Sequence, residues 1–547
     1  MPSLSIFIWL PLASGVLGSL LSMRVRRAGP VLALAGAVAT LALAIGYIAD
    51  YSPATHGLQH LTDVMWIKEL GIHYKLAISG LNVFLAGLTT LLFAAALLAA
   101  NFRAQRGTPY PQLFFVLMTL AESAVLGAFV AQDLALFVAF FDLMLIPFYF
   151  LTGIWGGPDR VKATIKLVIY TLVGSLLMLA GAVATGVLAS DQNGGHITFA
   201  LSALQALPLS TGSQEWIFLF FAAAFLVKMP AFPLHGWMPD GYKAMPIEAL
   251  MVFSGVLSKV GAYGFLAIVL PLFPQGAAHF QTLMLLIGLV SILYGSVVAF
   301  SHTDTRLIAG YSSVAQLGFI TIGIFSLNPQ GAQGALLQMV NHGLVVAPLL
   351  FIVLLLSERS GGSEDIRKMG GLAFRAPVFA SIFLIIALAT LAIPGSANFV
   401  GEFLILLGVF KAKLAIAIIA FAGVVMASVY ALRLFIRAMH NRTQTGAVSR
   451  EISLRDGAVL VPVVAVIVFF ALYPQLALKR SEGSVSASVS AAHVALTPIA
   501  ASLSPAYPGQ PSNRQADASE PSRGPAGGSE SSETGAVEAG EGSSEGR

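Results

Sequence analysis

Residues Phe225–Asp240 read FLVKMPAFPLHGWMPD, so Lys228 and His235 interrupt an apolar run that also holds three prolines. A proline removes a backbone donor and clashes with the preceding turn, so a helix through this stretch is broken. A protein core also excludes an ammonium group without a partner, because burying an unpaired charge is costly. The stretch therefore predicts an interrupted helix with a buried cation.

The composition indicates that lipid surrounds this helix. Of the 547 residues, 57% are apolar and 10% are charged, whereas soluble domains carry about a quarter charged residues. A soluble chain of this length could not bury so much apolar surface in one core. A membrane-spanning helix needs roughly 20 mostly apolar residues, and such runs recur nearly from end to end.

The absence of cysteine restricts the chemistry of the chain. It excludes disulfides, thiolate-bound iron–sulfur clusters and cysteine-bound zinc. The sequence has no Walker loop, GxGxxG or GxSxG motif, and its ten histidines lack zinc-ligand spacing. We therefore expect no cofactor and no metal in this chain. Nucleic acid is not an expected partner either, because no basic patch is interleaved with aromatic residues.

Hydropathy predicts fourteen membrane-spanning helices. The first is not a cleaved signal, because Arg24, Arg26 and Arg27 follow its apolar run instead of preceding it. The predicted spans are 4–22, 29–49, 78–100, 111–130, 132–155, 163–189, 215–238, 244–270, 277–300, 304–326, 331–357, 376–409, 411–440 and 457–476.

The basic residues predict the orientation. Lysine and arginine gather in alternate loops, beginning with the loop after the first span, and such loops stay on the cytoplasmic side. The other loops carry few, and the loop 191–215 carries none. Both termini are therefore predicted on the outer side of a bacterial inner (plasma) membrane.

Two of the predicted spans are interrupted. Pro230 and Pro233 break the seventh, and Pro394-Gly395 breaks the twelfth. Broken helices in lipid line protein or water-filled cavities, since the freed carbonyls need partners. Breaks five spans apart suggest an inverted repeat of the kind found in transporters. The predicted fold is an all-α polytopic membrane protein with two broken helices and an inverted pair of five-helix repeats.

These patterns predict five regions along the chain. The C-terminal extension is expected to be disordered from about residue 505, since it is rich in Ser, Gly, Pro and Glu and cannot bury enough apolar area. The regions are spans one to three (1–110), the first repeat (111–270), the second repeat (271–440), the last span (441–480) and the extension (481–547).

Ionisable residues at mid-membrane depth are the candidate functional residues. Each is costly to insert into lipid and marks an ion or proton path by default. Asp142, in LFVAFFDLMLIPFYF, needs a cation, and Lys228 is the candidate partner. The complete set is Glu122, Asp142, Lys228, Lys259, His342 and Glu402.

A purely structural role is an alternative for three of the polar residues. Lys166 lies near a helix end and could extend to the membrane surface. His342 could be a core histidine with satisfied hydrogen bonds, and Glu122 could cap a neighbouring polar group. Lys228 is harder to explain structurally, because it is central and precedes a proline break.

Several motifs between about residues 80 and 476 resemble one family. They are similar to the antiporter-like membrane subunits of proton-pumping NADH–quinone oxidoreductase (respiratory complex I), whose superfamily includes the large subunits of multisubunit Na+/H+ antiporters. The motifs are LMLIPFYFLTGIWGG (143–157), KLVIYTLVGSLLML (166–179), FLVKMPAFPLHGWMPD (225–240), GVLSKVGAYG (255–264), YSSVAQLGF (311–319), QMVNHGL (338–344) and GSANFVGEFLIL (395–406).

The chain resembles the M-type members of that family most closely. The resemblance rests on Glu402, in VGEF, where L and N types have lysine, and on a plan of fourteen spans without a long lateral helix. It implies proton translocation with no redox centre in this chain. NADH, FMN, iron–sulfur clusters and quinone are then expected in partner subunits, with the L- and N-type subunits and membrane lipid as neighbours.

The resemblance also implies a role for each candidate residue. Asp142 and Lys228 match the family's charged pair, and Lys259 matches the lysine that links two half-channels. His342 and Glu402 match the histidine and the terminal acid of the central polar axis. Two further candidate residues are Glu122, which matches an acid of the fourth helix, and His235.

The sequence departs from the family at four places. Asp142 is one methylene shorter than the usual glutamate, Gln316 replaces a histidine, and Arg306 replaces a lysine. The loop after Asp240 reads GYKAMP, without the usual histidine and glutamate.

Three functions are compatible with the sequence. The first is a proton-translocating subunit of NADH–quinone oxidoreductase, and the second is a subunit of a multisubunit Na+/H+ antiporter. The third, a non-pumping membrane scaffold, gains nothing from the cost of burying so many ionisable groups.

Overall fold

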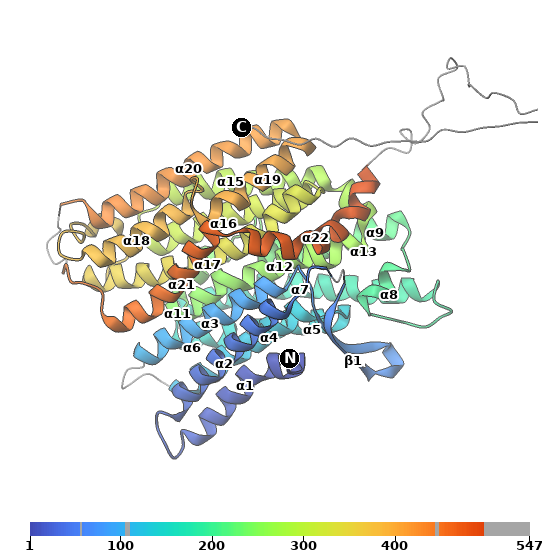
Figure 1. Ribbon diagram of the computed structural model, residues 1–547, viewed down its shortest axis with the longest axis horizontal. Coiled ribbons are helices and arrows are strands. Elements are labelled where there is room, and N and C mark those ends of the chain that lie inside the picture. The colour runs from blue at the N-terminus through green and yellow to red at the C-terminus, as the bar shows by residue number, and fades with distance from the viewer. Residues whose placement is uncertain (55–56, 104–109, 443–447, 497–547) are drawn as a thin grey trace, which may run out of the picture. The chain divides into compact units, whose positions relative to one another are not determined.

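Long helices make up most of the structure, because a segment in lipid must satisfy its backbone N–H and C=O groups internally. The structure, a computed structural model, describes residues 1–54, 57–103, 110–442 and 448–496. The predicted disordered tail lies outside these residues. Figure 1 shows the long helices side by side, with the hairpin strand β1, the short helix α8 and helix α22 toward one end.

The N-terminal region holds three long helices and one β-hairpin. Its strands pair antiparallel, with Asp63 opposite Lys75. The elements are α1 (Leu4–Leu21), α2 (Ala28–Asp50), β1 (Gln59–Ile67), the 3-10 turn η1 (Lys68–Leu70), β2 (Ile72–Ile78) and α3 (Val83–Arg103).

The region of the predicted first repeat begins at α4 and reaches α13. Its last span contains two π-helical turns, η2 and η3, on either side of α12. The elements are α4 (Pro111–Val130), α5 (Leu134–Leu143), α6 (Leu145–Trp155), α7 (Arg160–Ser190), α8 (Leu201–Gln205), α9 (Thr211–Lys228), α10 (Met238–Ala244), α11 (Ile247–Val252), η2 (Phe253–Leu257), α12 (Ser258–Gly264), η3 (Phe265–Val269) and α13 (Leu270–Leu272).

The remaining elements include α17, which packs against both halves of the chain. They are α14 (Pro274–His279), α15 (Gln281–Ser301), α16 (Thr305–Phe325), α17 (Pro329–Arg359), the 3-10 turn η4 (Ile366–Lys368), α18 (Pro377–Thr390), α19 (Ala397–Ala412), α20 (Leu414–Met439), α21 (Leu454–Leu472) and α22 (Gln475–Leu496).

Short polar side chains fix where several helices begin. Asp133 accepts a hydrogen bond from Leu136 N at 3.1 Å at the start of α5. Asp304 does the same for α16, and Asn328 does so for α17. Such N-caps satisfy amide groups that have no partner within the helix.

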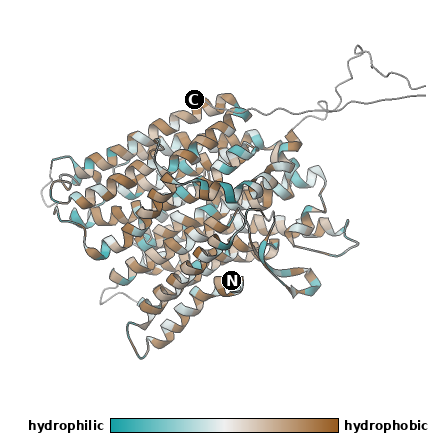
Figure 2. Cartoon of the chain, viewed as in Figure 1, coloured by the Kyte–Doolittle hydropathy of each residue, from teal (hydrophilic) through white to brown (hydrophobic). Residues whose placement is uncertain are grey.

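Twelve helical segments of the described chain are long and apolar enough to cross a membrane. Figure 2 shows hydrophobic colour along these helices and hydrophilic colour on the hairpin and loops. The other two predicted spans are the interrupted ones. Their breaks are confirmed, because α9 ends at Lys228 and α18 and α19 are separated by residues 391–396. The all-α membrane fold is confirmed, whereas the total of fourteen spans and the inverted repeat stay predictions.

Four features escaped prediction. The loop between the second and third spans forms the β-hairpin, and a turn at Met144 divides the fifth span into α5 and α6. The eighth span contains the two π turns. Helix α22 crosses the boundary expected at residue 480, so the predicted extension begins with ordered helix. Small and polar residues make up much of α22, and this concealed its apolar face.

Candidate functional site

Lys228 ends the interrupted helix α9 and is buried. Its Nζ donates to the carbonyl oxygen of Phe141 at 3.3 Å and lies 4.3 Å from the centre of the Phe141 ring. The ring face attracts the cation. The helix ends here because Pro230 cannot continue it.

Asp142 is half-buried beside Phe141 and lies near both Lys228 and Ser175. The two oppositely charged side chains make no direct ion pair, since no N–O distance between them falls within 4.0 Å. Asp142 Oδ1 is buried without a protein hydrogen-bond partner. The shorter side chain and the Phe141 carbonyl explain the separation, and a buried polar atom of this kind is commonly satisfied by water.

Lys259 lies on α12 and is fully buried. Its Nζ donates to Ser254 O at 2.6 Å and to Ser258 Oγ at 3.2 Å. Ser254 belongs to the π turn η2, where the wider turn changes the backbone bonding. The hydroxyl of Tyr242 donates to Ser254 Oγ at 2.9 Å, so hydrogen bonds extend from α10 to the backbone beside Lys259.

His342 lies on α17, buried and near Lys259. Its Nδ1 has no protein partner. A core histidine that is structural normally has satisfied ring nitrogens, so this site does not fit that reading. Lys259 is a charged neighbour of His342.

Glu402 lies on α19 and is held by two amides. Gln316 Nε2 donates to Glu402 Oε1 at 2.9 Å, and Gln338 Nε2 donates to the same oxygen at 3.3 Å. Gln338 Nε2 also donates to Gln316 Oε1 at 2.8 Å. Tyr430 lies near Glu402 and Gln316, with its hydroxyl buried.

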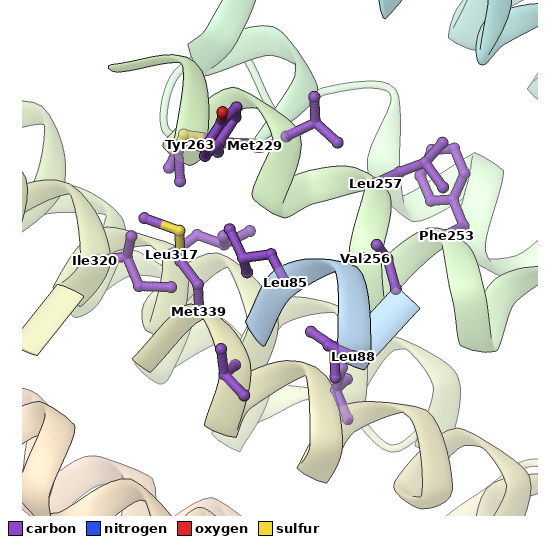
Figure 3. Packing of buried hydrophobic residues seen from close by; sticks show 14 of the residues in the cluster. Leu85, Leu88, Met229, Phe253, Val256, Leu257, Tyr263, Leu317, Ile320 and Met339 are labelled. Atoms are coloured by element: carbon purple, nitrogen blue, oxygen red, sulfur yellow. The ribbon is translucent and has the colours of Figure 1, made fainter. Parts of the chain in front are cut away.

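Helix α17 links the residues around Lys259 to the residues around Glu402, because it carries both His342 and Gln338. Gln338, which contacts Glu402, precedes His342 by four residues, so both side chains lie on one face of the helix. Figure 3 shows buried apolar side chains that pack on this helix: Leu317 and Ile320 of α16, Met339 of α17 and Leu85 of α3 lie close together. No hydrogen bond between described residues joins Lys228 to Lys259 or His342 to Glu402. Protons that cross these gaps need water.

The two remaining candidates, Glu122 and His235, have no hydrogen bond to these clusters within the described residues. Glu122 on α4 is fully buried, and neither of its carboxyl oxygens has a protein partner. His235 follows the break after α9 and lies among aromatic rings, 5.0 Å from Tyr294 and 5.8 Å from Phe232 between ring centres. Neither makes a hydrogen bond to Lys228, Lys259 or Glu402 within the described part of the chain.

Lys166 has a structural partner. Its Nζ donates to Asp240 Oδ2 at 2.8 Å, and this bond holds the pKa of the Asp240 carboxyl below its ordinary value. Lys166 thus ties α7 to α10 instead of extending freely to the surface.

The structure adds polar residues that the sequence analysis did not single out, namely Ser254, Ser258, Gln338 and Tyr430. Two of them stand inside the quoted motifs, Ser258 before Lys259 and Gln338 four residues before His342. For Gln338, the four-residue spacing to His342 was a signal in the sequence that both side chains share one face of a helix. Across the described ranges, no group of three or more His, Asp or Glu side chains could hold a metal ion.

Comparisons with known proteins identify one family. Residues 131–429 match the family described as NADH:quinone oxidoreductase/Mrp antiporter, TM. A Rhodobacter capsulatus protein named NADH-quinone oxidoreductase subunit M is 35% identical over 91% of this chain and 98% of its own length. An Escherichia coli (strain K12) protein of the same name is 36% identical over 82% and 89%.

Solved structures agree with this match. A chain of respiratory complex I from Thermus thermophilus with bound NADH is 30% identical, covers 90% of this chain and 99% of its own, and has a TM-score of 0.81. A chain of the Mrp complex from Dietzia sp. DQ12-45-1b has a TM-score of 0.75 at 20% identity, over 90% and 99% of the two chains. At that identity the second likeness concerns the fold alone.

Proposed function

Since the chain belongs to the NADH:quinone oxidoreductase/Mrp antiporter membrane family, we propose that it is the M-type, proton-translocating membrane-arm subunit of a bacterial NADH–quinone oxidoreductase. The observation that carries the proposal is the row of buried ionisable groups on interrupted helices. Lys228 ends a broken helix, Lys259 lies between two π turns, and Glu402 follows the second break. Such groups are costly in a membrane and mark proton paths.

The proton path begins at Asp142 and Lys228. Quinone reduction in partner subunits rearranges charge along the membrane arm and changes the separation of these two side chains. Because opposite charges stabilise each other, a change in their distance changes the proton affinity of both. The distance can vary because no direct ion pair holds the two side chains and Asp142 Oδ1 has no hydrogen-bond partner among the described residues.

The proton then passes to Lys259 and on to Glu402. His342 lies near Lys259, and Gln338 on the same helix contacts Glu402. Glutamine does not exchange a proton as histidine does, so Gln316 and Gln338 position the carboxylate, and Glu402 carries the proton toward the outer face.

The redox chemistry belongs to partner subunits. NADH, FMN, iron–sulfur clusters and quinone are bound there, and this chain contributes proton transfer alone. Its neighbours are the L- and N-type antiporter-like subunits and lipid. It lies in the bacterial inner membrane, and the lysine and arginine distribution supports an outward location of both termini.

Lys228→Ala tests the function in inverted membrane vesicles. NADH–quinone electron transfer and NADH-driven proton uptake are recorded together, with assembly checked on a native gel. We expect both rates to fall in an assembled complex. Lys413→Ala, which removes an exposed lysine at the start of α20, is the control and leaves both rates unchanged.

Na+/H+ exchange, recorded in the same vesicles beside these two rates, separates the alternatives. Loss of Na+/H+ exchange with unchanged NADH-driven proton uptake would identify a subunit of a multisubunit antiporter. Unchanged rates of every kind would identify a scaffold. Glu402 and the predicted plan of fourteen spans favour the respiratory complex over an antiporter, and the buried ionisable groups argue against a scaffold.

A further inference from the structure

A cavity of about 380 Å³ opens between the first half of α22 and the ends of several membrane-spanning helices. We call it the Arg480 pocket, after the one charged residue that lines it. A volume of this order suits a small ligand, since ligand pockets measure about 300–1,000 Å³. Its polar lining includes Tyr51, Ser79, Gln132, Arg480, Ser484 and Ser488.

The pocket lies where spanning helices end. Tyr51 directly follows α2, and Gln132 lies between α4 and α5. Pro271 lies at the end of the eighth span, and Arg480 lies in the second turn of α22, soon after α21 ends. The ends of spanning helices lie at the depth of the lipid headgroups. The pocket therefore opens at headgroup depth.

Arg480 carries a charge without a counterion in the described part of the chain. Its Nε is buried without a hydrogen-bond partner, and its guanidinium makes no ion pair with a described residue. None of the residues that line the pocket is acidic. A poorly solvated charge needs a partner, and the planar guanidinium matches the oxygens of a phosphate group. The pocket therefore suits a ligand that carries a phosphate.

Helix α22 adds a hydroxyl donor to the same wall. Arg480, Ser484 and Ser488 recur every four residues, so they share one face of the helix. Ser484 Oγ accepts from Gly80 N at 3.1 Å, which leaves its own hydrogen for a ligand oxygen. Ser488 Oγ donates to the carbonyl oxygen of Leu266 and so holds the wall against the eighth span.

The remaining lining favours a lipid over a free ion. It includes the apolar residues Leu58, Leu81, Leu201 and Ala487. The glycerol backbone and first methylene groups of a phospholipid cover such a surface, whereas a phosphate ion does not. An ammonium headgroup finds no acid in the pocket and is repelled by Arg480. A headgroup with hydroxyls, such as that of phosphatidylglycerol, can bond to the serine and glutamine side chains.

We propose that the Arg480 pocket binds one anionic phospholipid. Its phosphate lies on the Arg480 guanidinium and the Ser484 hydroxyl, and its glycerol backbone lies against the apolar wall. The bound lipid joins α22 to the segments before and after the hairpin, because Tyr51 and Ser79 line the same pocket. The proposal goes beyond the proposed function, since it involves none of the residues that carry protons.

Photocrosslinking in the purified complex tests the site. The probe is a phosphatidylglycerol with a photoactivatable group in its headgroup, and crosslinked peptides are identified by mass spectrometry. We expect crosslinks within residues 480–488. Arg480→Gln should weaken probe binding by about tenfold to a hundredfold, the size expected for a hydrogen bond to a charged group. Lys479→Gln is the control, because it removes the same charge from an exposed neighbour outside the pocket.

A second pair of variants keeps the charge and changes the space. Ala487→Phe fills the apolar side of the pocket while Arg480 stays, so it should lose the crosslinks as well. Ser490→Phe adds the same ring on the exposed face of α22, outside the pocket, and should keep them. All variants are compared at equal assembly on a native gel, and the second pair decides the question if Arg480→Gln does not assemble.

Competition identifies the ligand class. Unlabelled phosphatidylglycerol should displace the probe, whereas phosphatidylcholine and millimolar inorganic phosphate should not. Equal crosslinking of wild type and both pocket variants overturns the proposal, as does equal competition by phosphatidylcholine or complete displacement by inorganic phosphate. The readout is binding and uses no NADH, so it is independent of whether Lys228→Ala abolishes pumping.

Discussion

Replacing Gln316 by leucine tests whether the amides around Glu402 support proton transfer. The change removes the 2.9 Å bond from Gln316 to Glu402 and the 2.8 Å bond that Gln316 accepts from Gln338. Only the 3.3 Å bond from Gln338 to the carboxylate remains. A hydrogen bond to a charged group contributes about 1.5–3 kcal/mol, and about 1.4 kcal/mol corresponds to tenfold in rate. We expect proton uptake to fall by about tenfold to a hundredfold.

The assay is NADH-driven proton uptake in inverted vesicles, normalised to assembled complex. Gln192→Leu is the control, since it also loses one hydrogen bond, to Pro208 O, in a loop away from Glu402. Gln316→His, which restores a donor, should retain most of the uptake.

A double-mutant cycle decides whether Gln316 acts through Glu402. In a Glu402→Gln background the carboxylate is gone, so Gln316→Leu should have little further effect. Independent, additive losses from the two changes would refute the reasoning, because residues that act through one contact show a coupling energy.

Two further predictions concern stability. The Lys166–Asp240 pair is partly exposed, so we expect it to contribute less than about 1 kcal/mol to the free energy of unfolding. The pKa of the Asp240 carboxyl is lowered in the folded protein. The contribution is therefore present above the unfolded pKa of about 4 and is lost as the pH falls through the folded pKa. Thermal unfolding of the purified complex with and without Asp240→Asn should therefore differ at neutral pH and converge in acid, and a difference that grows in acid would contradict this. Gly408→Val should prevent close packing of α19 on α17, because a Cβ at this position would lie 2.4 Å from Gly331 Cα. Overpacking of this kind lowers the free energy of unfolding by about 1–3 kcal/mol. A Gly408→Val complex that assembles like wild type on a native gel would contradict this prediction.

The proline breaks illustrate what could be read from local sequence. A proline ends a helix whatever surrounds it, so the interruptions after Lys228 and before Ala397 follow from composition alone. The burial of Lys259, His342 and Glu402 was expected in the same way, because they interrupt long apolar runs. The family motifs added an expected role for each.

The contacts of these residues could not be read from the sequence. Lys228 bonds to a backbone carbonyl, and every residue has a carbonyl, so no residue type marks that partner. The π turns around Lys259 have no composition signal, since a π turn adds one residue to an otherwise ordinary helix. Helix α22 was missed because its small and polar residues resemble a linker until its inward face meets η3 and α14.

The sequence by itself determined that lipid surrounds the chain, which segments form helices and which ionisable residues are buried. These properties depend on the free energy of transferring individual residues into lipid. Only the tertiary structure decided which charges meet. It separated Asp142 from Lys228, placed two amides on Glu402, and brought the segments that flank the hairpin together with α22 around one cavity. Such contacts join residues far apart in the chain, and their geometry follows from how whole helices pack, which no local pattern specifies.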